Sequence, residues 1–220
     1  MGDEPERLTL GRMQNPVRGF LHGAAAGASV VGTVALAARA APGHEPALLV
    51  FTLSLVGLYT VSSLYHSVPW RRRWKARMQR VDHAMIFVLI AAPYTPVAWV
   101  VLDGWQRVAA LAVAWGLAAA GVLQKLLLPG LRETLTFGAM LLQGWLALPL
   151  FLPLAERLPL AAVGLMALGG VLYTVGAVCL LTERPRLWPR VFSYHEAFHV
   201  CVVAGSAAHY ALMFGYVARF

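Results

Sequence analysis

The sequence contains few charged residues. Only 13% of its 220 residues are Asp, Glu, Lys or Arg, whereas 59% are hydrophobic; an average soluble domain has about a quarter charged residues. The mean hydropathy of +0.65 agrees with this composition. The scarcity of charge excludes a disordered chain and an ordinary soluble enzyme, and it indicates a surface that contacts lipid.

Cysteine is also scarce, since Cys179 and Cys201 are the only two. Both lie inside apolar runs, which favours small packing residues over a disulfide or a metal-binding pair. A disulfide-stapled scaffold is therefore excluded. The sequence also lacks internal repeats and the alternating segments of about ten residues that form a membrane β-barrel. A helical membrane protein remains.

Seven apolar runs are bounded by charged residues or by Pro and Gly, and each has about the 20 residues that a spanning helix needs. They predict helices at 19–41, 47–68, 81–102, 106–128, 134–154, 159–182 and 194–218. We therefore predict an all-α integral membrane protein. Residues 19–220 would form a seven-transmembrane-helix bundle, and residues 1–18 a short cytoplasmic N-terminal segment.

The basic residues are divided unequally between the two ends of this bundle. Of the 18 Lys and Arg residues, fourteen fall on the side of the amino terminus, and the other side holds Arg39, Arg107, Arg157 and Arg219. Because cytoplasmic connections carry the excess of Lys and Arg, we expect a cytoplasmic amino terminus and an extracytoplasmic carboxyl terminus. We expect a multi-pass protein of the plasma membrane. The same rule explains the net charge of +8, so no nucleic-acid partner is expected.

Three predicted spans carry polar residues that a membrane disfavours, by roughly 2.5–3.5 kcal/mol for each ionisable group. Ser62 and His66 lie near the end of the second span, Asp82 opens the third, and His195 and His199 open the seventh. Because successive spans alternate in direction, His66 lies about one helical turn inside the cytoplasmic face, and the polar residues that open the third and seventh spans lie at a similar depth. Chance would scatter them between the two leaflets.

The spacing of these residues indicates a metal site. Residues four apart share one helix face, with about 5–6 Å between their Cβ atoms. His195 and His199 therefore form a clamp for a divalent metal, and His66 offers a third imidazole from another helix. Three imidazoles and an open fourth position are typical of catalytic zinc, although imidazoles also suit iron and nickel. We predict that His66, His195 and His199 bind zinc.

Asp82 and Ser62 are the predicted catalytic residues. The pKa of a zinc-bound water is about 7 in known sites, so such a water can lose its proton near neutral pH. Asp82 would orient this water or carry its proton, and Ser62 would donate a hydrogen bond to a substrate carbonyl. This machinery hydrolyses amides or esters, here of a lipid from the inner leaflet. Two alternatives stay open: Asp82 could pair with a basic residue of the 71–80 loop, and Ser62 could bond its own helix.

The segment His195–His199 also matches H-E-x-x-H, a metalloprotease motif whose glutamate is the general base. Intramembrane metalloproteases take a third ligand from an L-D-G segment, and Leu102–Gly104 has that sequence. The predicted third span places Asp103 at the far face, about 30 Å from the histidines. The two groups cannot share a metal, so a protease is not expected. Glu196 has no assigned role.

As an ordered set, these motifs resemble the hemolysin III family, which is related to the progestin and adipoQ receptors and to alkaline ceramidases. The matching segments are Arg18–His22, Ser62–His66, Arg80–His83, Pro93–Pro96 and Tyr194–Tyr210. The resemblance implies a seven-helix bundle with zinc on the residues that match His66, His195 and His199. It also implies that Asp82 and Ser62 flank the zinc water, and that the substrate is a fatty-amide or ceramide-like lipid.

Three other functions stay open. A non-enzymatic receptor or signalling protein would bind zinc to stabilise its structure, although structural zinc sites prefer four protein ligands. A cytolytic protein is suggested by the family name alone. A transporter would need polar groups along a path through the membrane, whereas the candidates cluster at one end. His22 and His83 are either neighbours of the site or interfacial residues.

Overall fold

The computed structural model describes residues 10, 13, 15–128, 130–188 and 190–220. The named elements in this part of the chain are all helices. Within it, seven helical segments are long and apolar enough to cross a membrane: Pro16–Arg39, Glu45–Ser67, Arg72–Val101, Gly104–Leu127, Glu133–Arg157, Leu160–Thr182 and Tyr194–Val217. The predicted all-α fold with seven membrane-spanning segments is confirmed. Most of the predicted segment 1–18, with Arg7 and Arg12, lies outside the described residues.

Four spans are single helices, namely α1 (Pro16–Arg39), α2 (Glu45–Ser67), α5 (Gly104–Leu127) and α8 (Leu160–Thr182). The third span consists of α3 (Arg72–Ala91) and α4 (Tyr94–Val101). The fifth consists of α6 (Glu133–Trp145), the 3-10 turn η1 (Leu148–Leu150) and α7 (Phe151–Arg157). In the seventh, α9 (Tyr194–Leu212) continues into the π-helical turn η2 (Met213–Val217).

The third and fifth spans are interrupted at prolines. Pro93 separates α3 from α4, and Pro149 lies in η1. Proline lacks a backbone N–H and collides with the carbonyl of the preceding turn, so a helix ends or kinks at it. The hydroxyl of Tyr94 donates to the carbonyls of Gln143 and Gly144, at 2.5 and 3.0 Å. The two interrupted spans are therefore tied together at their breaks.

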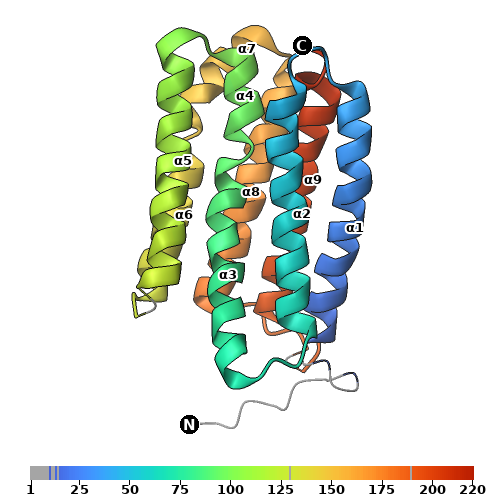
Figure 1. Ribbon diagram of the computed structural model, residues 1–220, viewed down its shortest axis with the longest axis vertical. Coiled ribbons are helices and arrows are strands. Elements are labelled where there is room, and N and C mark those ends of the chain that lie inside the picture. Colours follow the sequence, from blue (N-terminus) through green and yellow to red (C-terminus); the bar gives the residue numbers. More distant parts are fainter. Residues whose placement is uncertain (1–9, 11–12, 14, 129, 189) are drawn as a thin grey trace.

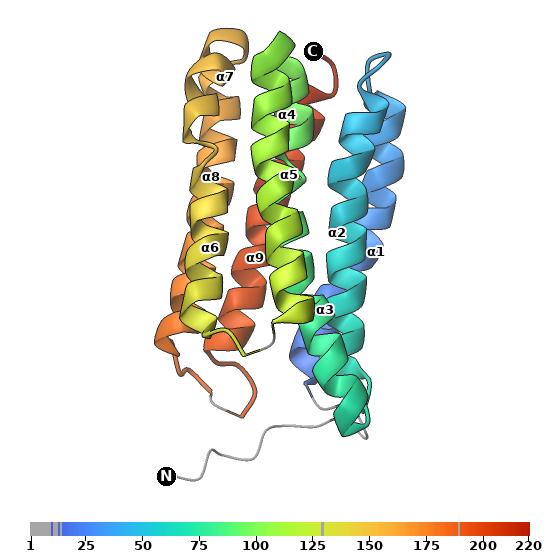
Figure 2. The ribbon, with the colours of Figure 1, turned by 60° about the vertical axis from the view of Figure 1, so that its left-hand side comes forward.

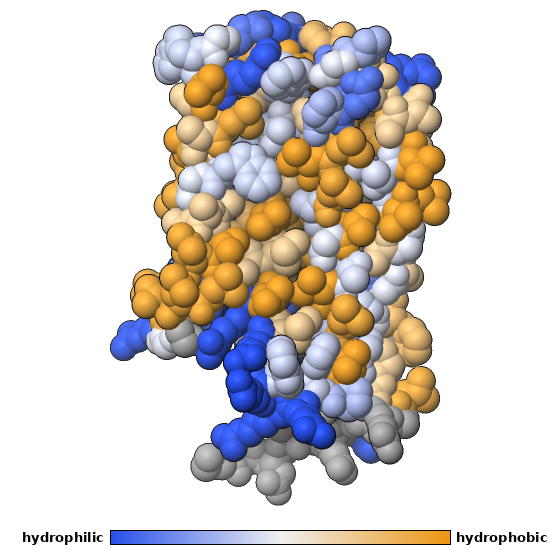
Figure 3. Space-filling model, in the orientation of Figure 1, coloured by the Kyte–Doolittle hydropathy of each residue, from blue (hydrophilic) through white to orange (hydrophobic). Residues whose placement is uncertain are grey.

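Helix α3 begins at Arg72, well before the boundary expected at residue 81. Most of the side chains in this first part of α3 are exposed. Figure 3 shows hydrophilic side chains gathered over it at one end of the molecule. Hydropathy marks where the lipid ends, whereas Arg and Lys are good helix formers that continue the hydrogen-bonded helix into water. The α3 helix therefore projects beyond the apolar part of the bundle.

The second, third and seventh spans are the most buried in the bundle. In their apolar windows 50%, 61% and 44% of residues are buried, against 17–28% in the other four. Helix α1 packs along α2 and α8 along α9, while α3 contacts α2, α5 and α6 (Figures 1 and 2). The three inner spans are those on which the sequence places the candidate site residues.

Candidate metal centre

Three histidine side chains from α2 and α9 converge at one end of the bundle. His66 lies in the last turn of α2, and His195 and His199 lie in the first turns of α9. Their candidate ligand atoms all lie within 4.8 Å of one another. His66 and His199 are buried, and His195 is half-buried. The three residues predicted as ligands are therefore positioned to hold a metal ion.

The donor chemistry of this cluster fits a metal. Nδ1 of His199 is buried and has no hydrogen-bond partner among the residues that the structure describes. An unpaired buried polar atom destabilises a fold by about 1–3 kcal/mol, and a bound cation would remove this penalty at a nitrogen lone pair. Neutral imidazoles are common ligands of zinc. We call the cluster of His66, His195 and His199 the three-histidine centre.

The start of α9 orients two of these histidines. Ser193 is the N-cap residue, and its side chain accepts a hydrogen bond from the backbone N–H of Glu196. In return, the Glu196 carboxylate accepts from the backbone N–H of Ser193 at 2.8 Å. This reciprocal capping box fixes where the helix begins. It thereby sets the direction in which His195 and His199 leave the helix.

Glu196 also joins α9 to α1. Its Oε1 accepts a hydrogen bond from Nε of Arg18 at 2.6 Å, and both side chains are buried. Both oxygens of Glu196 are thus engaged in structural contacts. Asp103 lies at the opposite end of the bundle, where it pairs with Arg107 and Arg157 at 3.1 and 2.7 Å. The H-E-x-x-H and L-D-G segments therefore do not assemble a protease site.

The Arg18–Glu196 pair should be important for stability. We expect Arg18→Met to destabilise the protein by about 3–5 kcal/mol, because it leaves the Glu196 carboxylate buried without its cation. Adding Glu196→Gln should recover part of this loss. The measurement is thermal unfolding of the purified protein. Arg186→Met is the control, since the Arg186–Glu183 pair is exposed, and it should change stability by less than about 1 kcal/mol. Equal effects of Arg18→Met and Arg186→Met would contradict this expectation.

Asp82 and Ser62 lie beside the three-histidine centre. Asp82 comes from α3 and Ser62 from α2; both are buried, and both line the same cavity as His195 and His199. Among the described residues, no basic side chain forms an ion pair with Asp82. The atoms that converge as candidate ligands come from the histidines, and Asp82 is outside that group. Its position next to the centre leaves its carboxylate available for a role other than coordination.

His22 is a neighbour of the centre to which the sequence assigned no definite role. Its ring centroid lies 4.0 Å from that of His199 and 4.9 Å from that of Tyr59. The side chain is buried, and neither ring nitrogen has a hydrogen-bond partner in the described part of the chain. The spacing of His22 from Arg18 is the sequence pattern that could have indicated that His22 faces the interior. Residues four apart share a helix face, and both of these face the interior.

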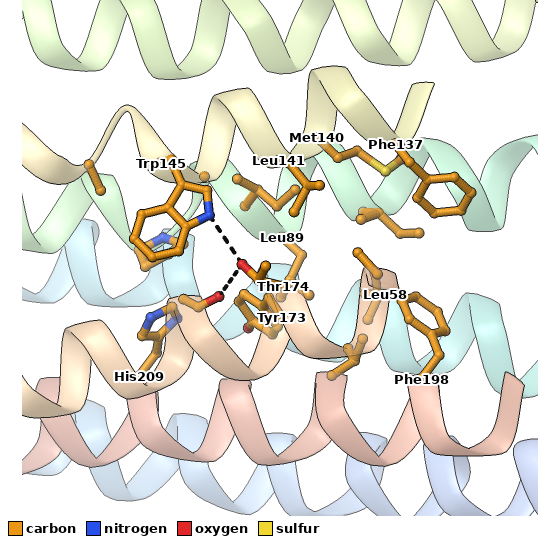
Figure 4. Close-up of a pocket in the computed structure, with 18 of the residues that line it drawn as sticks. Leu58, Leu89, Phe137, Met140, Leu141, Trp145, Tyr173, Thr174, Phe198 and His209 are labelled. Carbon is orange, nitrogen blue, oxygen red and sulfur yellow. Dashed lines mark hydrogen bonds between the residues drawn. The ribbon is translucent and has the colours of Figure 1, made fainter. Parts of the chain in front are cut away.

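The centre opens into a cavity with a free volume of about 140 Å³ between α3, α6, α8 and α9 (Figure 4). The polar end is lined by His22, Ser62, Asp82, His195 and His199. Beyond it the wall is mainly apolar and includes Leu58, Leu89, Phe137, Met140, Phe198 and Val202. Trp145 and Leu148 of the fifth span line the cavity and are 39% and 54% exposed.

A bundle of seven membrane-spanning segments, with three histidines converging at one end, defines a multi-pass membrane protein with a candidate metal centre. Residues 11–210 match the family described as Haemolysin-III related. The chain is 31% identical over 170 residues to a hemolysin-3 homolog of Bacillus subtilis (strain 168), covering 77% of this chain and 76% of the relative. It is 29% identical over 221 residues to hemolysin-3 of Bacillus cereus, covering 99% and 98%. The chain belongs to the hemolysin III family.

Proposed function

We propose that this protein is a zinc-dependent hydrolase that cleaves an amide or ester bond of a membrane lipid. The observation that carries the proposal is the cavity. Its lining includes His195 and His199 of the three candidate metal ligands, together with Asp82 and Ser62, and it continues into an apolar interior. A lipid with its carbonyl at the polar end would have its acyl chain along the apolar wall.

Zinc is the metal that this donor set favours. Catalytic zinc sites use three protein ligands and keep the fourth position open for water or substrate, whereas structural sites use four. The candidate ligand atoms come from three histidines. The ring of His22 is tilted by only 34° from that of His199, so it lies against that ring rather than among the converging nitrogens. This arrangement supports a catalytic rather than a structural metal.

The residues around the metal would divide the work of hydrolysis. Zinc bound there would polarise the carbonyl and make water nucleophilic at neutral pH. The carboxylate of Asp82 would accept a proton from the attacking water and deliver it to the leaving nitrogen or oxygen. The hydroxyl of Ser62 would donate a hydrogen bond to the carbonyl oxygen as negative charge develops there. The acyl carbon gains the hydroxyl, the bond to the leaving group breaks, and a fatty acid is released.

The position of the centre supports action from the cytoplasmic leaflet of the plasma membrane. The three-histidine centre lies at the end of the bundle that carries the basic first part of α3. Excess Lys and Arg mark the cytoplasmic side of membrane proteins. With this orientation the carboxyl terminus is extracytoplasmic. The substrate we propose is a fatty-amide or ceramide-like lipid of the inner leaflet.

Metal removal tests the proposal. Purified protein in lipid nanodiscs would be assayed for fatty-acid release from a panel of lipid amides and esters. We expect release by the protein as purified, loss of release after treatment with a chelator, and recovery on adding zinc but not magnesium, which prefers oxygen ligands. A wild-type protein that is folded and binds no metal would contradict the proposal. Release that survives complete metal removal would contradict it as well.

Cytolysis is the second candidate, because both relatives are named hemolysins. The outward-facing surface is largely apolar, as expected for a resident membrane protein (Figure 3). Lysis of red cells by the purified protein, unaffected by changes at the three-histidine centre, would favour this second function. Lysis that depends on the centre would instead attribute the damage to lipid hydrolysis.

A further inference from the structure

The first part of α3, with the residue before it, carries a dense group of positive charges. We call residues 71–80 the basic segment, and this segment contains no acidic residue. Its basic residues are Arg71, Arg72, Arg73, Lys75, Arg77 and Arg80. All of them except Arg80 are exposed. A third of the 18 Lys and Arg residues of the chain therefore lie within ten positions.

The arginines of the basic segment have no acidic partner in the part of the chain that the structure describes. None of the ion pairs formed there includes one of them. Arg73, Arg77 and Arg80 follow one another at spacings of four and three, so they share one helix face. Like charges at this spacing repel one another and destabilise a helix. This face of α3 therefore favours an anionic ligand.

The length of the basic segment matches the polar layer of a membrane. Helix α3 begins at Arg72, and its apolar part begins near residue 81. The residues between them rise about 14 Å along the helix axis. The headgroup layer on one side of a bilayer is roughly 5–8 Å thick. Figures 1 and 2 show α3 extending past the ends of α5 and α6, so the basic segment passes through the headgroup layer.

Trp74 supports this depth. Its side chain is 51% exposed, and exposed tryptophans of membrane proteins concentrate at the level of the headgroups. The guanidinium carbon of Arg77 lies 4.9 Å from the centroid of the Trp74 ring, a cation–π contact. A guanidinium can bind a phosphate group through two parallel N–H···O hydrogen bonds. Arg77 is thus held at the depth where lipid phosphates lie.

The connection between α2 and α3 fixes the direction of the basic segment. The indole of Trp70 donates a hydrogen bond to the carbonyl of Leu64, in the last turns of α2, at 3.0 Å. The carbonyl of Arg71 accepts from the backbone N–H groups of Trp74 and Lys75 at 2.8 and 2.9 Å. The arginines are therefore carried on an ordered helix, which lowers the entropy lost when a ligand binds.

We propose that the basic segment of α3 binds the headgroups of anionic phospholipids, with Arg73, Arg77 and Arg80 as the main contacts. Clusters of about four to eight basic residues next to a membrane-spanning helix attract anionic lipids. All phospholipids share the phosphate, so the net negative charge of the headgroup is what this segment selects. Because none of these arginines lines the cavity, the binding does not depend on the proposed hydrolysis.

The test compares two lipids that differ in headgroup charge. Full-length protein in a neutral detergent would be titrated with dioleoyl phosphatidylglycerol or with dioleoyl phosphatidylcholine, and bound lipids per chain would be counted by native mass spectrometry. We expect phosphatidylglycerol to bind at least about tenfold more tightly. Arg77→Gln should weaken its binding about fivefold, the ratio expected for one basic residue near an anionic surface. Combining Arg73→Gln, Arg77→Gln and Arg80→Gln should remove most of the preference and leave phosphatidylcholine binding unchanged.

Two further variants control for charge and position. Replacing the same three arginines with lysine keeps the charge, and it should retain most of the preference because lysine also binds phosphate. Arg219→Gln removes an exposed charge at the opposite end of the bundle and should have no effect. Equal affinity of the wild type for both lipids, or a preference that survives the triple glutamine change, would overturn the proposal. Equal weakening by Arg219→Gln and Arg77→Gln would also overturn it, since the net charge of +8 would then explain the preference.

Discussion

Replacing His199 with alanine should empty the metal centre. Wild-type protein is expected to carry near one zinc per chain, and His199→Ala or His66→Ala nearly none. Changing a residue that only orients a zinc ligand weakens affinity about 10–100-fold, so losing one of three direct ligands should weaken it by more than about 100-fold. The zinc content per chain of each protein would be measured by mass spectrometry after dialysis in a zinc-buffered solution. Fatty-acid release should disappear in the same variants.

Two histidines elsewhere in the bundle serve as matched controls for this experiment. His44 is the N-cap residue of α2, at the end of the bundle opposite to the centre. His209 lies on the same helix as two of the ligands, but deep in the cavity. His44→Ala and His209→Leu should both retain zinc. If all four variants kept the metal, or all four lost it, the assignment of His66 and His199 as ligands would be rejected.

The sequence was sufficient to predict that His66, His195 and His199 converge, because their arrangement follows from helical periodicity and membrane depth. His195 and His199 share a helix face by their spacing, and the length of each span brings His66 to the same level. The same logic separated Asp103 from the histidines, and the structure places that aspartate at the other end, in contact with Arg157. Depth and periodicity do not depend on how the helices are packed, so they can be derived from one chain.

Contacts between helices distant in the sequence could not be predicted in this way. Arg18 and Glu196 form a buried pair although 178 residues separate them. The orientation of α1 about its axis decides that His22 faces His199 rather than lipid, and one sequence does not specify that rotation. The packing of the His209 ring depends on Gly169 of α8, because a side chain at that position would collide with the ring. These features follow from side-chain packing, which hydropathy does not encode.

Asp82→Asn should separate metal binding from catalysis. The amide is close in size to the carboxylate, and Asp82 is not among the converging ligand atoms, so zinc should stay near one per chain. The variant cannot accept a proton at this position, and positioned proton transfer contributes about 10²–10⁴-fold to rate. We therefore expect fatty-acid release to fall by about that factor. Initial rates and metal content would be measured on the same preparation.

Asp103→Asn is the control for this change, because Asp103 is an exposed aspartate on the opposite end of the bundle. It should retain both zinc and the wild-type rate. An Asp82→Asn variant that hydrolyses lipid at the wild-type rate would show that the carboxylate is structural. A variant that loses zinc together with activity would show that Asp82 acts by supporting the histidines. If Asp82 transfers a proton beside a zinc held by three histidines, Asp82→Asn must hydrolyse lipid slowly while keeping its full zinc content. Such a role would also explain why a buried acidic residue lies next to Ser62, in a part of the membrane where charge is unfavourable.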